Sequence, residues 1–76
     1  MRITYDREVD ALYIRFGDGP VTTRDLGEGI AADFDAAGHL AGIEILDVTA
    51  RLDQPNLLKE IVLENLVPPA TSKPAA

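Results

Sequence analysis

Residues 11–20 read ALYIRFGDGP, and this stretch decides the fold class because apolar and polar side chains alternate along its first six positions. Every second side chain from Leu12 to Phe16 is apolar, whereas Tyr13 and Arg15 fall on the opposite side of an extended chain. A period of two over six residues predicts a β-strand with one buried face. The GDGP sequence at its end predicts a tight turn, because Asp-Gly and Gly-Pro both interrupt regular structure.

The same alternation recurs on both sides of this stretch. Residues 2–5, 21–26, 30–35 and 40–46 also have strand character, and short polar or glycine-containing connections separate them. Because a parallel crossover needs about a dozen residues or more, we expect successive strands to be antiparallel neighbours. The pattern therefore predicts an antiparallel β-meander of four to five strands with one apolar face.

The last third of the chain contains a candidate cover for that face. Asp47 is a candidate N-cap for a short helical turn, and Pro55 stands at the start of a longer helix near residues 56–66. At 100° per residue, the apolar side chains of this helix fall within an arc of about 180°. They are Leu57, Leu58, Ile61, Val62 and Leu66. The predicted fold class is α+β, a sheet covered on one face by a C-terminal α-helix.

Two apolar residues fall outside that arc. Leu63 and Val67 lie on the far side of the predicted helix, which suggests a second buried surface such as the helix of another copy. The alternative is two exposed aliphatic side chains at a fraying helix end. We expect one small domain over residues 1–67, followed by a flexible Pro/Ala-rich tail at residues 68–76.

Composition narrows the class of protein further. The chain has 76 residues, a formal net charge of −6 and no cysteine, so disulfides and thiolate zinc sites are excluded. The acidic balance argues against a nucleic-acid ligand, and no apolar run approaches the roughly 20 residues of a membrane span. We therefore expect a cytoplasmic protein with neither a nucleic-acid nor a membrane partner. So small a chain gains stability by pairing, and a homodimer is expected.

Residues for nucleophilic catalysis are scarce. The only histidine is His39, and the only serine is Ser72 in the proline-rich tail, so a rigid Ser-His-Asp arrangement cannot be assembled. We expect no catalytic residue and no cofactor. Tyr13 and Arg15 share one strand face and are candidate interface residues, the alternative being a cross-strand pair in which Arg15 meets acidic side chains.

Residues 33–44 have the outline of a calcium-binding loop. Asp33, Asp35 and Glu44 occupy its first, third and twelfth positions, but Ala37 stands where another acid is required. The flanking segments also alternate like strands, whereas such a loop lies between helices. We therefore interpret the acids as a solvated hairpin face, and keep a metal-binding or hydrolytic site as an alternative.

Several short phrases together resemble a known family. They are Tyr5-Asp6, DALYIRF at 10–16, DFD at 33–35 and LAGIEILD at 40–47, and the resemblance to the small bacterial family labelled domain of unknown function 2283 covers about residues 3–50. It implies a small sheet-plus-helix fold with no established activity, and an accessory or antitoxin-like role beside a protein partner. The leading hypothesis is a non-catalytic protein-interaction module that acts as a homo-oligomer. The alternatives are the metal-binding or hydrolytic protein and a purely structural dimer.

Overall fold

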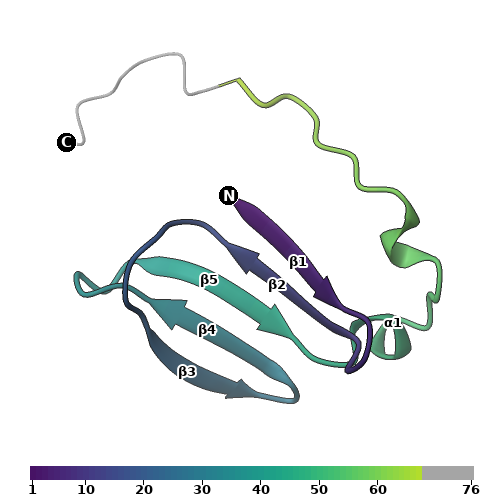
Figure 1. The fold of residues 1–76 in the computed structure, drawn as a ribbon, viewed down its shortest axis with the longest axis horizontal. Coiled ribbons are helices and arrows are strands. Elements are labelled where there is room, and N and C mark those ends of the chain that lie inside the picture. Colours follow the sequence, from purple (N-terminus) through teal and green to yellow (C-terminus); the bar gives the residue numbers. More distant parts are fainter. Residues whose placement is uncertain (68–76) are drawn as a thin grey trace.

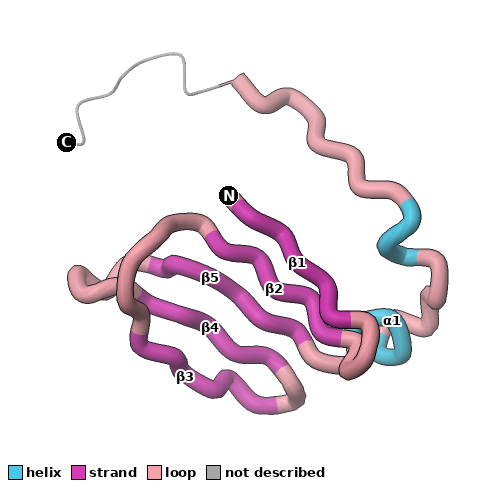
Figure 2. The backbone as a smooth tube through the Cα atoms, in the orientation of Figure 1, coloured by secondary structure: helices cyan, strands magenta, loops and turns pink. Residues whose placement is uncertain are grey.

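The computed structural model describes residues 1–67 and shows a five-stranded antiparallel sheet with very little helix (Figure 1). The strands are β1 (Arg2–Asp6), β2 (Ala11–Arg15), β3 (Thr22–Gly27), β4 (Ile30–Phe34) and β5 (Leu40–Ile45). A four-residue helix, α1 (Val48–Arg51), and a 3-10 turn, η1 (Leu57–Lys59), follow the sheet (Figure 2). The proline-rich tail expected at 68–76 lies outside the described residues.

The alternation of the sequence separates the two faces of the sheet as expected. Facing pairs such as Leu12 with Ile45 and Ile14 with Ile43 place apolar side chains on the same side. We call this side the apolar face; its members are Ile3, Tyr5, Leu12, Ile14, Phe16, Ile30, Ala32, Phe34, Ile43 and Ile45. The opposite side is the polar face, formed by Thr4, Asp6, Tyr13, Thr23, Asp33 and Glu44.

The expected meander is wrong. The strand order is β1-β2-β5-β4-β3, so β2 pairs with β5 and β3 lies at the far edge. The strands β3, β4 and β5 follow one another as hairpins, and β2 returns beside β5 in a Greek-key arrangement. Alternation tells which face a side chain occupies but not which strand lies next to it, and the sequence pattern could not distinguish the two orders.

The connection between β2 and β3 makes this order accessible. It has six residues, 16–21, which can span about 20 Å when extended. Three strand spacings amount to about 14 Å, so the connection can pass the ends of β5 and β4, as Figure 1 shows. The guanidinium of Arg15 donates to the carbonyl oxygens of Gly17, at 2.6 Å, and Gly19, and so holds this connection to the end of β2.

The covering helix expected at residues 56–66 is also not formed. Only η1 is helical in that region. Glu60, directly after it, is extended (φ −141°, ψ 128°), and residues 60–67 form no regular secondary structure. An isolated helix of this length is marginal in water and needs a packing surface to persist. In Figure 1, the segment from η1 to Val67 runs away from the strands and does not overlie the sheet. The described chain is therefore mostly β, and its apolar face has no covering layer.

The buried core is correspondingly small. In the described residues, the buried hydrophobic side chains belong to Ala11, Ala32, Ala41 and Val48, and among them Val48 is fully buried, with 1% of its surface exposed. The large aliphatic side chains of the apolar face are at best half-buried. The sheet is thus a single layer rather than one side of a closed core.

At one end of the sheet, helix α1 contacts both the β1–β2 hairpin and the turn between β3 and β4. Its N-terminus is capped by Asp10, from the turn after β1, and not by Asp47 as expected. The Asp10 carboxylate accepts hydrogen bonds from the Thr49 amide (3.1 Å), the Thr49 hydroxyl (2.8 Å) and the Ala50 amide (3.3 Å). It also accepts one from the Tyr5 hydroxyl at 2.6 Å. Asp47 makes no side-chain cap, because it has the left-handed conformation itself (φ 52°).

The other end of α1 contacts the turn between β3 and β4. The Arg51 guanidinium donates to the Glu28 carbonyl oxygen and to the Leu46 carbonyl oxygen (3.4 Å). These bonds, together with the Asp10 cap, join the β1–β2 hairpin to the three strands that follow it.

The Asp10 cap leads to a stability prediction. Replacing Asp10 with Asn should lower the melting temperature by on the order of 5 °C, because the amide offers one acceptor oxygen and presents N–H groups to the remaining donors. Asp47→Asn is the matched control, since Asp47 has nearly the same left-handed φ and no cap to lose. Thermal denaturation followed by circular dichroism measures both, and equal losses in the two variants would contradict the cap.

Candidate functional site

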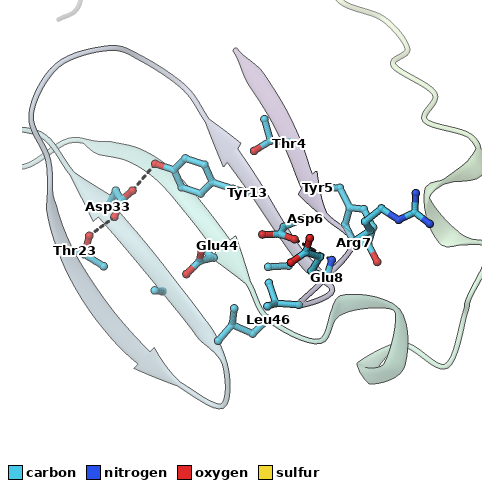
Figure 3. Close-up of a pocket in the computed structure, with 13 residues that line it drawn as sticks. Thr4, Tyr5, Asp6, Arg7, Glu8, Tyr13, Thr23, Asp33, Glu44 and Leu46 are labelled. Carbon is cyan, nitrogen blue, oxygen red and sulfur yellow. Dashed lines mark hydrogen bonds between the residues drawn. The ribbon is translucent and has the colours of Figure 1, made fainter.

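The most specific side-chain arrangement lies on the polar face and joins three strands. The Tyr13 hydroxyl on β2 donates to Oδ2 of Asp33 on β4, and the Thr23 hydroxyl on β3 donates to Oδ1 of Asp33 at 2.6 Å. Figure 3 shows the Tyr13 ring directed across the sheet towards Asp33, with Thr23 reaching the same carboxylate from the other side. Asp33 is 9% exposed and is the buried charged residue of the described chain.

This contact depends on a glycine between the two strands. Tyr13 and Asp33 are separated by β5, where Gly42 faces both Asp33 and Arg15 in the sheet register. A Cβ atom at position 42 would lie 2.8 Å from the Tyr13 hydroxyl oxygen and 3.0 Å from the Ile14 carbonyl oxygen. The missing side chain therefore lets the tyrosine pass over β5 and reach the next strand but one.

The hydrogen bonds change the acid–base behaviour of both partners. The Thr23 hydroxyl and then the Tyr13 hydroxyl stabilise the Asp33 carboxylate, which holds the pKa of Asp33 below its usual value despite partial desolvation. The same bond to Asp33 raises the pKa of Tyr13. A carboxylate of lowered pKa is a weak base, and a phenol of raised pKa is a poor proton donor. The pair therefore suits a structural role better than proton transfer.

An open groove of about 720 Å³ lies on the polar face next to this network. The turn between β1 and β2 forms part of its wall, and Figure 3 shows acidic side chains on both sides of it. Four acids and one arginine line the groove: Asp6, Glu8, Asp33, Glu44 and Arg7. The groove is thus acidic overall, which favours cationic over anionic contacts.

The acids considered for a metal site are distributed over separate places. Asp33 is held by Tyr13 and Thr23, whereas the Asp35 carboxylate accepts the backbone amides of Ala37 (2.9 Å) and His39 (2.8 Å) in its own turn. Those amides lower the pKa of Asp35, the His39 amide most strongly. Over residues 1–67, the structure brings together no three metal-ligating side chains of the kind a metal centre needs.

The four candidate interface residues fall into two groups. Tyr13 and Arg15 both bind inside the chain, Tyr13 to Asp33 and Arg15 to the β2–β3 connection. Leu63 and Val67 lie in the irregular segment after η1, with 60% and 80% of their surfaces exposed. Tyr13, rather than Arg15, makes the cross-strand contact with an acid.

Three residues of these contacts carried no functional interpretation at the level of sequence. Threonine is common in strands, and glycine and aspartate are common in turns, so the local sequence gives Thr23, Gly42 and Asp10 no functional role. A glycine inside an otherwise regular strand was the available signal, because it marks a close approach by another group. The Asp10 cap joins residues about 40 positions apart and leaves no local pattern.

The fold and site define a small single-layer β protein in which polar side chains bind one another on one face and apolar side chains are left uncovered on the other. The chain belongs to the family described as Protein of unknown function (DUF2283), which matches residues 2–48 and confirms the resemblance in the sequence. The match contains all five strands and ends at Val48, the first residue of α1. No curated protein and no solved structure matches the chain. None of the helices within residues 1–67 has the length and apolar character to cross a membrane.

The glycine crossing can be tested by adding one methyl group. Gly42→Ala should lower the free energy of unfolding by about 1–3 kcal/mol, because the new Cβ displaces the Tyr13 ring and meets the Ile14 carbonyl. Gly17→Ala is the matched control, since no atom lies within 4 Å of its added Cβ. Chemical denaturation measures both changes, and similar values for the two variants would argue against a steric role for Gly42.

The lowered pKa of Asp33 predicts a pH dependence of stability. Because the folded pKa lies below the unfolded value of about 4, the unfolded state binds more protons between these two pKa values. Stability from Asp33 is therefore present above pH about 4 and is lost as pH falls through the folded pKa. Urea denaturation from pH 7 to 2.5 should show a smaller acid loss in Asp33→Asn than in the wild type. Parallel curves would show that Asp33 does not contribute.

Proposed function

We propose that this protein is a non-catalytic protein-interaction module that works in the cytoplasm as a homodimer. The observation that carries the proposal is the uncovered apolar face. An apolar sheet face is normally packed against a second layer. Here Ile3 and Phe16 are 38% and 40% exposed, and the aliphatic side chains further inside the sheet are half-buried. Apolar surface of this kind, next to polar surroundings, is typical of a site for another protein chain.

The C-terminal segment supports the same proposal. Its large aliphatic side chains are 56–80% exposed: Ile61, Val62, Leu63, Leu66 and Val67. Their sequence spacing favours a helix, and a packing surface is what a short amphipathic helix needs to form. We propose that this segment becomes ordered when two chains meet, and that Leu63 and Val67 then contact the second copy.

The side chains of the polar face support a non-catalytic role, and their charge suggests that a further partner would be basic. Both oxygens of the Asp33 carboxylate accept hydrogen bonds from hydroxyl donors, so Asp33 is not free to act as a base. The excess of acids around the groove and the net charge of −6 would attract a basic protein. An antitoxin-like or accessory role, in which the dimer holds a small basic partner, is the form of the proposal that fits this charge.

The experiment is a measurement of molar mass by light scattering. The wild type should have twice the mass of one chain, and the double variant Leu63→Asp/Val67→Asp should shift towards one chain, because two buried carboxylates oppose association. Leu26→Asp is the control, since Leu26 on β3 is similarly exposed (57%). A monomeric wild type would overturn the homodimer, and a double variant that stays dimeric would remove this segment from the interface.

A further inference from the structure

We infer that β1 of one copy pairs antiparallel with β1 of a second copy, with the two-fold axis at Thr4. This inference rests on the proposed homodimer and adds the edge, the register and the facing residues. The paired strands would join two five-stranded sheets into one continuous sheet with a shared apolar face.

The two edges of the sheet differ in how well they resist such pairing. The register between β3 and β4 shifts between Asp25 and Gly27, and the Asp25 carboxylate accepts the Gly27 amide at 2.8 Å. A bulge and adjacent charged residues, Arg24 and Asp25, are typical protections of an edge strand. By contrast, β1 runs in regular register with β2 over all five of its residues and contains neither proline nor lysine.

The backbone groups available at the β1 edge follow from the neighbouring pairing. The Phe16 amide donates to the Ala41 carbonyl at 2.9 Å, so residue 16 directs its backbone towards β5. Because backbone direction alternates along a strand, Tyr13 and Arg15 direct theirs towards β1 and bond Thr4 and Arg2. The N–H and C=O groups of the intervening residues, Ile3 and Tyr5, therefore face outwards from the sheet.

These outward groups select the register of a second β1. An antiparallel partner must pair Ile3 with Tyr5, Ile3 with Ile3, or Tyr5 with Tyr5, since only outward groups can bond each other. The first choice is the one that aligns all five residues. It places Arg2 opposite Asp6 of the second copy at both ends of the contact, and an aliphatic residue beside an aromatic one on the apolar face.

Charge complementarity supports this choice among the three. Arg2 forms no ion pair within residues 1–67, where the pair between His39 and Asp35 (3.6 Å) is the one that the structure shows. Asp6 accepts one backbone amide, from Glu8 at 2.9 Å, and retains acceptor capacity. The symmetric register gives each of these charges an opposite charge on the other copy.

A different occupant of the edge is the C-terminal segment of the same chain. Its apolar residues do not alternate, and Asn65 has a positive φ of 56°, which interrupts an extended strand. A second β1 therefore matches this edge better than the C-terminal segment does. Occupancy of the edge by that segment is the alternative that the test below distinguishes.

A single cysteine at the symmetry axis tests the inference. Thr4 would face Thr4 of the second copy as a non-hydrogen-bonded pair with Cα atoms about 4.5 Å apart, within the range of a disulfide. The chain has no cysteine, so Thr4→Cys introduces the only thiol. Under mild oxidation we expect disulfide-linked dimer on a non-reducing gel, formed at least about tenfold faster than with Thr22→Cys on the opposite edge.

The outcomes separate this inference from the proposed homodimer. If light scattering shows a dimer but Thr4→Cys links no faster than Thr22→Cys, the β1 pairing is wrong and another surface, such as the C-terminal segment, forms the dimer. If the wild type is a monomer and Thr4→Cys does not link, the homodimer and the pairing both fail.

A charge exchange gives a second, independent measurement. Arg2→Asp and Asp6→Arg should each weaken dimerisation by about tenfold, because each places two like-charged pairs across the contact. The double variant Arg2→Asp/Asp6→Arg should recover most of the wild-type affinity, since the opposite charges again face each other. The lost Asp6 contact with the Glu8 amide is common to Asp6→Arg and the double variant, so failure of the double variant to recover would overturn the register.

Discussion

The Tyr13 hydroxyl bound to Asp33 across Gly42 is the constraint on which the arrangement of the sheet depends. It connects β2 to β4 over an intervening strand, and Thr23 extends the same hydrogen-bonded group to β3. Pairing between adjacent strands alone leaves a single-layer sheet able to twist and slip. A side chain that spans three strands limits this freedom, because a shift of any one strand would separate the hydroxyl from the carboxylate.

The two faces of the sheet therefore differ in how well their side chains are paired or buried. On the polar face, Tyr13, Thr23 and Asp33 bind one another, and no buried side-chain polar atom of residues 1–67 is left without a partner. On the apolar face, the large aliphatic side chains remain partly exposed. The molecule thus resembles one half of a β-sandwich, in which the buried polar side chains are paired but the apolar face is incompletely buried. This imbalance is the physical reason to seek its role in association with another chain.

The sequence was sufficient for the parts of the structure that depend on local pattern. Alternation identified all five strands and the side of the sheet on which Leu12 and Tyr13 lie, and the motif phrases identified the family. Strand order escaped prediction because the β2–β5 pairing is decided by contacts distant in the chain. The C-terminal helix was predicted near residues 56–66 but does not form, because helical spacing produces a stable helix only where a surface packs against it. The role of Gly42 depends on the contact between Tyr13 and Asp33 across β5, and no local sequence pattern indicates that contact.

The strand order also has a consequence for how the chain is made. As a ribosome releases the polypeptide, the β1–β2 hairpin emerges first, but the inner edge of β2 has no partner until β5 follows it. The Asp10 carboxylate lacks its backbone donors for longer still, because the amides that it caps belong to Thr49 and Ala50. The nascent N-terminal half therefore exposes an unpaired strand edge throughout synthesis of the middle strands. Closure of α1 onto Asp10 marks the moment at which the newly synthesised sheet can become complete.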